Sequence, residues 1–398
     1  MEQFEEAFEK AMARGSDGVP GAAVAVVNQE GNYVYQNVKG HDGVHNGATA
    51  LNFDRTFFLA SCTKLITSIA ALQTVERDLI RLDDPLDEHL PELTTQPIIV
   101  GGVDATFEWK QATKSITLRH LLSHSSGAVY DFMDSALTAW RQSREETPTV
   151  SQSGIVAKDY AMPRTFEAGE GWMYGTSLDW AGLLVARLNS MSLEQYVEEN
   201  ISIPLGMTSF TWHLSRKPHV EGNLVRMSVR GEDGKLSAGT HPPFPEPVEE
   251  GGGAGLYANV HDYTRVLADL LKDSPILLKK TSVDMLFAPQ FEEGGAGLSA
   301  LYANSEMTYK PMVGQSIDGI VINHGLGGLL VQEDIQRETY FKPKGTLTWS
   351  GLPNLLWSIN RERGLALMFA VQVIPWNDKE VQSLSAQFET AVWRHLSR

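Results

Sequence analysis

The sequence has only one cysteine, Cys62, among its 398 residues. A single thiol excludes an internal disulfide and any metal site built from several cysteines. Because free cysteine is most often a small core residue, we expect Cys62 to pack in the interior without taking part in chemistry.

Positive charge and long apolar runs are also scarce. Lysine and arginine number 33 against 49 aspartates and glutamates, which gives a net charge of −16. Such a surface repels phosphate backbones and anionic lipid, so neither nucleic acid nor a membrane is expected as a partner. No run reaches bilayer length, and residues 1–10 lack the basic start and apolar stretch of a secretory signal. We expect a soluble, cytoplasmic protein, with a monomer favoured.

Several catalytic and cofactor motifs are missing as well. No Gly-x-Ser-x-Gly occurs, which argues against an α/β-hydrolase. The glycine-rich segment 251–255 lacks dinucleotide-loop spacing and a following Lys-Ser/Thr, so a flexible or close-packed loop near the site is predicted. His120 and His124 share one face of a predicted helix, but no third ligand accompanies them. We give them a structural role and expect neither a metal nor a cofactor.

The patterns that are present separate the two ends of the chain from its middle. A nearly continuous apolar run at 21–28 predicts a buried strand, and a second strand is expected around 33–35. Three strand-like runs near the end are joined by short links with glycine, proline or asparagine, as antiparallel hairpins need: 346–349, 355–359 and 365–371. Between about 60 and 290 the periodic signals are helical.

We therefore expect an α/β (α+β) architecture built from two parts. Residues 1–60 and 290–398 would form one domain with a central antiparallel sheet flanked by helices, closed by a helix with Asp378 as its N-cap. Residues 61–289 would form an inserted, mainly helical domain. The crevice between the two is the expected place of a site.

The most informative pattern is Ser61-Cys62-Thr63-Lys64, which precedes a run with apolar residues at helical spacing. A serine and a lysine three residues apart on a helix point the same way. Ser-x-x-Lys is the nucleophile motif of serine β-lactamases and penicillin-binding proteins, in which a desolvated lysine can act as base. On its own the motif is also compatible with an ordinary helix start and a surface lysine.

Two further segments carry groups that such a nucleophile needs. Tyr174 lies in a glycine-flanked loop, residues 166–176, where a tyrosine can relay a proton if a cation lies nearby. The segment 349–352, Trp-Ser-Gly-Leu, ends a predicted strand, and a free N–H at such an edge can stabilise an oxyanion. Without the Ser-x-x-Lys motif, Tyr174 would be interpreted as an ordinary packed aromatic residue and the segment 349–352 as an ordinary hairpin.

The order of these motifs resembles the class C β-lactamase-related serine hydrolases. The similarity covers most of the chain and is closest to the fungal branch of that family. That branch includes a lovastatin-pathway acyltransferase, which moves a 2-methylbutyryl group, and a lovastatin hydrolase, which removes it. It is carried by five segments, found here at 61–64, 117–127, 166–174, 204–207 and 349–351.

The resemblance implies a β-lactamase/transpeptidase-like fold and a role for each matching residue. Ser61 would be the nucleophile, Lys64 its base partner and Tyr174 the second proton-transfer residue. The backbone N–H groups of Ser61 and Leu352 would form the oxyanion hole. The residues implied to contact substrate are Tyr130, Trp172, Trp349, Ser350 and Gly351.

Two departures from the β-lactamase pattern bear on the substrate. In the Tyr-x-Asn motif of β-lactamases the third residue is asparagine, whereas here it is Thr176. The segment Trp349-Ser350-Gly351 replaces their Lys-Thr-Gly. The second change removes a cation suited to a β-lactam carboxylate and supplies a broad apolar ring. We predict a serine carboxylester hydrolase that acts through an acyl-enzyme on a small apolar ester. The fungal resemblance implies the 2-methylbutyryl ester of lovastatin, giving monacolin J. The alternatives are an acyltransferase using an alcohol acceptor, a β-lactamase and a catalytically silent binding protein.

Overall fold

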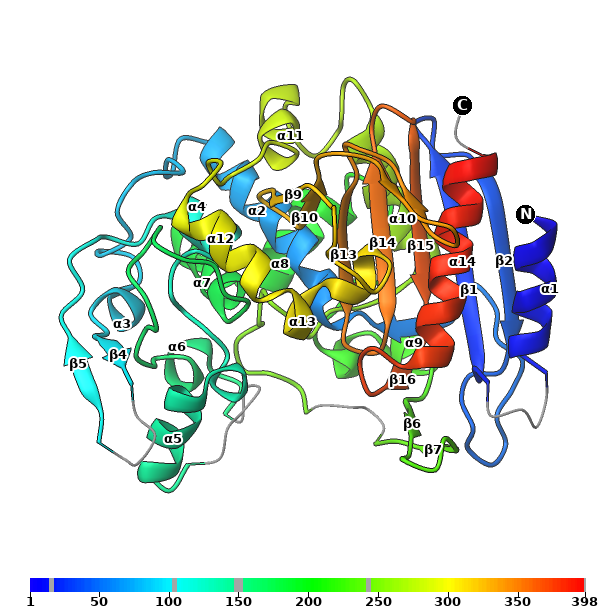
Figure 1. Ribbon diagram of the computed structural model, residues 1–398, viewed down its shortest axis with the longest axis horizontal. Coiled ribbons are helices and arrows are strands. Elements are labelled where there is room, and N and C mark those ends of the chain that lie inside the picture. Colours follow the sequence, from blue (N-terminus) through cyan, green and yellow to red (C-terminus); the bar gives the residue numbers. More distant parts are fainter. Residues whose placement is uncertain (14–17, 102–105, 147–152, 241–244, 397–398) are drawn as a thin grey trace.

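The computed structural model describes residues 1–13, 18–101, 106–146, 153–240 and 245–396. Its centre is a seven-stranded sheet in the order β2-β1-β15-β14-β13-β10-β9, in which all neighbouring strands are antiparallel (Figure 1). The strands are β1 (Gly21–Asn28), β2 (Tyr33–Gly40), β9 (Ile322–His324), β10 (Leu329–Val331), β13 (Leu347–Gly351), β14 (Leu355–Asn360) and β15 (Leu365–Ala370).

The two ends of the chain share this sheet, as predicted. β1 pairs with β15 in a register that places Ala23 opposite Ala370 and Asn28 opposite Leu365. All residues of β1 except Asn28 are buried, as are all residues of β15, because both faces of the sheet are covered at this point. That burial explains the nearly continuous apolar runs. β2 lies at the edge, is more exposed and is longer than the segment predicted from the sequence.

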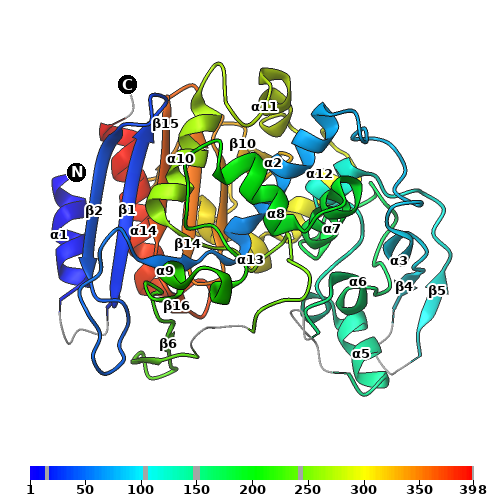
Figure 2. The ribbon, with the colours of Figure 1, turned by 180° about the vertical axis from the view of Figure 1, so that it is seen from behind.

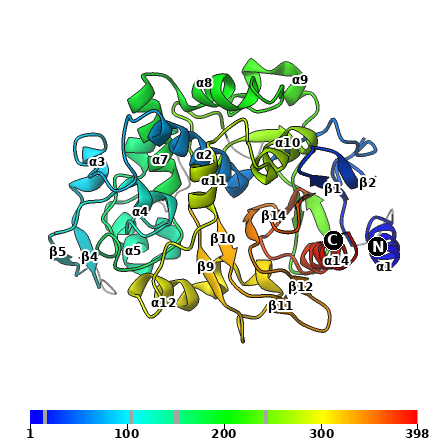
Figure 3. The same ribbon diagram turned by 90° about the horizontal axis from the view of Figure 1, so that it is seen from above.

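Helices cover the two faces of the sheet. On one face lie α1 (Glu2–Ala11) and α14 (Lys379–His395), and on the other lies α10 (Val260–Leu271) (Figures 2 and 3). Phe388 of α14 packs against both α1 and the sheet, since its ring centroid lies 5.2 Å from that of Phe4 in α1 and 6.2 Å from that of Phe369 in β15. The predicted N-cap of α14 is confirmed, because the Asp378 side chain accepts a hydrogen bond from the Val381 N–H.

The remaining helices cluster mainly beside the sheet, around α2 (Thr63–Glu76) and α7 (Ser177–Asn189), which pack against each other (Figure 1). Both are mostly buried. The others are α3 (Pro91–Thr94), α4 (Leu118–Leu122), α5 (Ser135–Ser143), α6 (Val156–Asp159), α8 (Leu193–Val197), α9 (Pro218–Glu221), α11 (Lys280–Leu286), α12 (Ala296–Ala303) and α13 (Ser305–Thr308).

Short strands interrupt this helical part, an addition that the sequence patterns did not predict. Two of the pairings join distant segments: β3 (Thr56–Phe58) with β8 (Tyr257–Asn259), and β6 (Ser228–Arg230) with β16 (Val373–Ile374). The others join neighbouring segments: β4 (Ile98–Val100) with β5 (Glu108–Lys110), β6 with β7 (Leu236–Ala238) and, beyond the helical part, β11 (Ile335–Gln336) with β12 (Phe341–Lys342). In the described part of the chain, no helix is both long enough and apolar enough to span a bilayer.

One local prediction is wrong. His120 and His124 were expected on one helix face, but α4 ends at Leu122, and His124 has a left-handed backbone with φ of 56°. The His120 ring instead completes the capping box of α4, because its Nδ1 accepts from the Thr117 N–H at 3.2 Å. A side chain that caps the helix start and one beyond the helix end cannot share its face.

Candidate active site

Ser61 lies in a short 3-10 turn, η1 (Ala60–Cys62), which leads directly into α2. Ala60 has φ of 45°, a left-handed conformation that typically costs an alanine on the order of 1 kcal/mol or more and that clusters at functional sites. Side chains hold the turn: Thr63 Oγ1 donates to the Ala60 carbonyl at 2.6 Å and the Tyr263 hydroxyl to the Cys62 carbonyl at 2.8 Å. Cys62 is buried as predicted, and burial raises the pKa of its thiol.

The hydroxyl of Ser61 contacts both of its predicted partners. Ser61 Oγ and the Tyr174 hydroxyl form a hydrogen bond, and Lys64 Nζ lies 3.3 Å from Ser61 Oγ. Lys64 Nζ also lies 4.5 Å from the centroid of the Tyr174 ring. A serine, an amine and a phenol thus meet at one point, which is the arrangement needed to take a proton from the serine and return it elsewhere.

Lys64 is not a surface lysine, since only 3% of it is exposed. Its side-chain nitrogen, Nζ, donates to the Gly253 carbonyl at 2.7 Å and contacts the Tyr130 hydroxyl at 3.4 Å. These contacts compensate for the loss of water around a buried amine. They also fix the direction of the side chain toward Ser61.

Tyr130 and Tyr174 lie side by side because two loops approach closely. A Cβ on Gly175 would overlap the Ala128 carbonyl oxygen, so glycine is required there. The Thr176 N–H donates to that carbonyl at 3.1 Å, and the tyrosine ring centroids are 5.4 Å apart. Burial raises the pKa of Tyr130 well above its usual value, with the charge of Asp179 adding to the effect.

Trp349 forms an aromatic wall behind Tyr174. It is 4% exposed, and its ring lies 5.4 Å from Tyr174, 6.3 Å from His124 and 5.8 Å from His324. Burial lowers the pKa of His124 well below 6.5 and that of His324 to about 4, so both rings are neutral at pH 7. Trp172 is buried in a deeper position, 6.4 Å from His124 and 6.0 Å from His324, and its contact with substrate stays a prediction.

The end of β13 approaches the Ser61 turn. A Cβ added to Gly351 would lie 2.5 Å from the Leu59 carbonyl oxygen and 3.4 Å from Cys62 Sγ, so the backbones meet where a side chain would not fit. Ser350 and Gly351 are buried within the strand. Leu352 follows the strand and is 47% exposed. This proximity is compatible with an oxyanion hole formed by two backbone N–H groups.

The glycine-rich segment lies at the site and is close-packed. In addition to the Gly253 carbonyl on Lys64, the Gly252 carbonyl accepts from Thr67 Oγ1 of α2 at 2.7 Å. The Gly253 N–H donates to the buried carboxylate of Asp179 at 2.9 Å. Sequence patterns missed Asp179 entirely, since an aspartate in the first turn of a helix is ordinary and nothing local marks it as part of a site.

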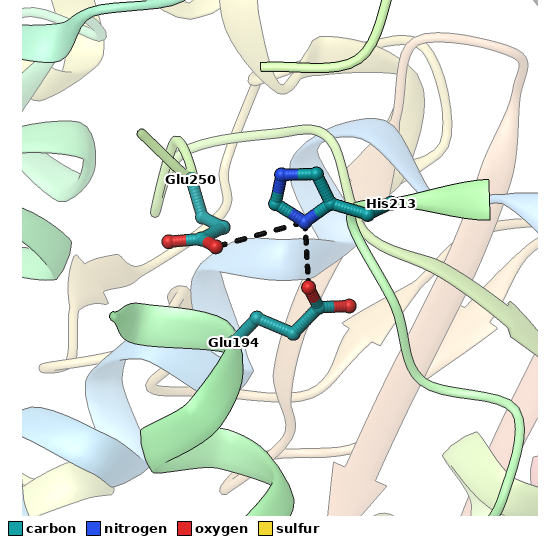
Figure 4. Close-up of side chains that lie close together, drawn as sticks. All are labelled: Glu194, His213 and Glu250. Carbon is teal, nitrogen blue, oxygen red and sulfur yellow. Dashed lines mark hydrogen bonds and ion pairs between the residues drawn. The ribbon is translucent and has the colours of Figure 1, made fainter. Parts of the chain in front are cut away.

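A second buried polar cluster holds the start of the glycine-rich segment. Glu194, His213 and Glu250 place ligand-type atoms within 4.8 Å of one another (Figure 4). His213 Nδ1 lies 2.6 Å from Glu194 and 3.6 Å from Glu250, while its Nε2 faces the Pro247 carbonyl at 3.0 Å.

Arg216 reaches the same cluster, with its Nη1 2.8 Å from Glu194. Burial favours the neutral form of His213, but the hydrogen bond and charge of Glu194 outweigh it and raise the pKa of the imidazole. With an acceptor at each ring nitrogen and an arginine beside the carboxylates, the cluster fits an ion-pair network better than a metal site.

An apolar cavity of about 180 Å³ lies on the glycine-rich segment. Its walls include the aromatic residues Phe58, Tyr160, Trp212 and Tyr257, with Asp179 also on its lining. The cavity borders Asp179 and the glycine-rich segment, whereas Ser61, Lys64 and Tyr174 are not among its lining residues. Walls of this kind favour an apolar group.

The chain is similar in sequence and in structure to known proteins. The family model described as Beta-lactamase matches residues 4–391. The acyltransferase calJ of Penicillium decumbens is 38% identical over 371 residues, covering 91% of this chain and 86% of that protein. The lovastatin esterase of Penicillium rubens is 30% identical, with 98% of each protein covered. Among solved structures, unliganded simvastatin synthase from Aspergillus terreus is similar with a TM-score of 0.86 and 34% identity, over 98% of this chain and 97% of that one.

Proposed function

The chain belongs to the beta-lactamase family and is an enzyme, and on that premise we propose that it is a serine carboxylester hydrolase that works through an acyl-enzyme on Ser61. One observation carries the proposal. Ser61 Oγ is hydrogen-bonded to the Tyr174 hydroxyl and lies 3.3 Å from the buried amine of Lys64. An amine and a phenol in contact with a serine hydroxyl are the groups that activate a serine nucleophile.

In the proposed first half-reaction, Ser61 Oγ attacks the ester carbonyl carbon. Its proton passes to Lys64, directly or through the Tyr174 hydroxyl that it touches. The carbonyl oxygen becomes an oxyanion, which accepts hydrogen bonds from the Ser61 and Leu352 N–H groups. When the C–O bond to the alcohol breaks, the alkoxide takes the proton back through Tyr174 and leaves.

The second half-reaction repeats these steps with water as the nucleophile and releases the acid. An alcohol can replace water without any change in the protein groups, which would make the enzyme an acyltransferase. This second candidate is favoured by the resemblance to calJ and to simvastatin synthase, whose names denote transfer and synthesis. The lovastatin esterase favours the hydrolytic outcome.

For the substrate, we propose a neutral, apolar ester of the statin type, with the 2-methylbutyryl group of lovastatin as the acyl part. Support comes from the apolar wall at Trp349, from the aromatic cavity and from the statin names of two relatives. Trp349 stands where β-lactamases keep a lysine, so a β-lactam carboxylate would meet no cation from that position. We also propose that the protein is cytoplasmic and monomeric.

Mass spectrometry after incubation with lovastatin tests the proposal. The expected products are the free decalin alcohol and 2-methylbutyric acid, with a transient 2-methylbutyryl adduct on Ser61 that Ser61→Ala lacks. Adding a thioester donor and the decalin alcohol separates the two candidates, because a transferase forms the ester faster than the free acid. Full turnover by Ser61→Ala would overturn the mechanism.

A further inference from the structure

Asp179 is a buried carboxylate that faces the back of the site. It lies in the first turn of α7, where the helix N-terminus favours negative charge, and is 2% exposed. Buried aspartates are uncommon unless they are paired or hydrogen-bonded. Because no step of the proposed mechanism uses this carboxylate, its presence so close to Lys64 calls for an explanation.

The glycine-rich segment is shaped around this carboxylate. Asp179 Oδ1 accepts the Gly253 N–H at 2.9 Å. A Cβ on Gly253 would overlap Asp179 Oδ2, and one on Gly251 would lie 2.9 Å from Oδ1. The backbone therefore reaches the carboxylate only because both positions are glycine.

The same residue carries the contact to Lys64. The Gly253 N–H is bound to Asp179, and the Gly253 carbonyl is the acceptor 2.7 Å from Lys64 Nζ. The carboxylate thus fixes one side of Gly253 and the lysine contacts the other. A change at Asp179 would move the carbonyl that aims Lys64 at Ser61.

Charge couples the two groups as well. Burial raises the pKa of Asp179 to about 6, and the charge of Lys64 acts in the opposite direction. At neutral pH the carboxylate is therefore ionised, and its charge stabilises the positive charge that Lys64 gains when it takes the Ser61 proton. The other titratable groups around the pair are Tyr130, Tyr160, Tyr174, His124 and Cys62.

We propose that Asp179 is a positioning residue that holds the Gly253 carbonyl on Lys64 and supplies the negative charge opposite the ammonium formed when Lys64 takes the Ser61 proton. This inference rests on the proposed function and adds to it the residue that orients and balances the base. It also explains why positions 251 and 253 are glycine, since a side chain at either would collide with Asp179.

The test compares Asp179→Asn with Asp269→Asn. Asp269 is also fully buried on a helix and also accepts backbone N–H groups, from Ile276 and Leu277, but it holds a different loop. Asp179→Asn keeps the shape and loses the charge. We expect kcat to fall about 10- to 100-fold with KM little changed, since misplacing a catalytic group has an effect of that order.

The pH profile separates this role from a merely structural one. Burial raises the pKa of Asp179 to about 6, so the wild-type enzyme loses this negative charge as the pH falls through that value. Asp179→Asn has no such titration, so the acid limb of kcat/KM should move to lower pH in that variant and stay in place in Asp269→Asn. An unshifted limb with wild-type kcat would overturn the inference. The inference would also be overturned if Asp179→Asn lowered kcat without shifting the acid limb and Asp269→Asn lowered kcat to the same extent.

Gly253→Ala provides a second route that leaves the carboxylate in place. Its methyl group must push Asp179 or the segment away, so kcat should fall as in Asp179→Asn, whereas Gly222→Ala at a helix end should not change it. Labelling Ser61 with a fluorophosphonate keeps the two proposals distinguishable. If Ser61→Ala is inactive while both site variants match wild type, only the role of Asp179 fails. If Ser61→Ala is active, the proposed function fails first.

Discussion

The indole ring of Trp349 lies 5.4 Å from the ring of Tyr174, centroid to centroid, at an angle of 39°. Trp349 comes from the central sheet and Tyr174 from the loop before α7, so this contact joins the two parts of the fold at the site. The tyrosine that touches Ser61 is held from behind by a side chain of another element. The position of Tyr174 thus depends on the packing of its loop against the central sheet.

Replacing Trp349 should therefore affect stability and activity together. Trp349→Ala removes a buried ring, which typically lowers the free energy of unfolding by about 3–5 kcal/mol. The same variant should lose turnover, because Tyr174 loses its support. Urea denaturation followed by ester assays measures both effects. Trp109→Ala, at a ring that is 49% exposed, serves as the control and should leave stability within about 0.5 kcal/mol. Equal losses in the two variants would contradict the packing argument.

Removing the Tyr174 hydroxyl should affect the rate alone. Tyr174→Phe keeps the ring stack but deletes the group bonded to Ser61 Oγ, so turnover should fall by about 10²–10⁴-fold, the usual range for a proton-transfer group. Initial rates on an apolar ester measure the effect. Tyr196→Phe is the matched control, since Tyr196 is a fully buried tyrosine in α8. A wild-type rate for Tyr174→Phe would leave Lys64 as the sole proton carrier.

The Glu194–His213 pair should stabilise the protein most at intermediate pH, so the free energy of unfolding should fall at both lower and higher pH. Burial alone would raise the pKa of Glu194, but the hydrogen bonds from His213 and Thr211 outweigh burial and lower this pKa from its usual 4.5 to about 2. This contribution to stability is present above pH 4.5 and is lost as the pH falls toward 2. The raised pKa of His213 contributes below 6.5 and is lost as the pH rises through its folded value.

The pair is therefore strongest between pH 4.5 and 6.5. The difference in Tm between the wild type and His213→Gln should be largest in this window and should shrink toward alkaline pH. His219→Gln, at an exposed histidine, should show no such window. A difference that is flat with pH would show that His213 acts by packing alone.

Cys62 should be unreactive in the folded protein. Burial raises the pKa of its thiol, so little thiolate forms and reagent has no access. Iodoacetamide at about pH 8 should label the denatured chain and leave the native one unlabelled, as mass spectrometry can show. Labelling of the native protein would mean that the Ser61 turn opens.

The family, the fold class and enzymatic activity were predicted from the sequence and are confirmed by the comparisons. Apolar runs marked the central strands because burial on both faces leaves a strong signal. The two-domain division at 61 and 289 and the roles of individual site residues stay predictions.

What the sequence did not predict depends on contacts between distant residues. Gly253 lies 189 positions from Lys64, and no local pattern joins them. Asp179 likewise looks like an ordinary residue of a first helical turn. His124 was misplaced because a helical spacing continues past the point where α4 ends.

The pairing of β1 with β15 also has a consequence for how the protein is made. β1, which carries Ala23, cannot pair with β15 until the segment that carries Ala370 has also been synthesised. The strand that carries Trp349 is also made long after Ser61, so a nascent chain cannot assemble the site around Ser61 until that strand has emerged. Such long-range pairing slows folding and leaves apolar strands uncovered until their partner strands have been made. Expression yield should therefore respond to chaperones and growth temperature more than the stability of the finished fold would suggest.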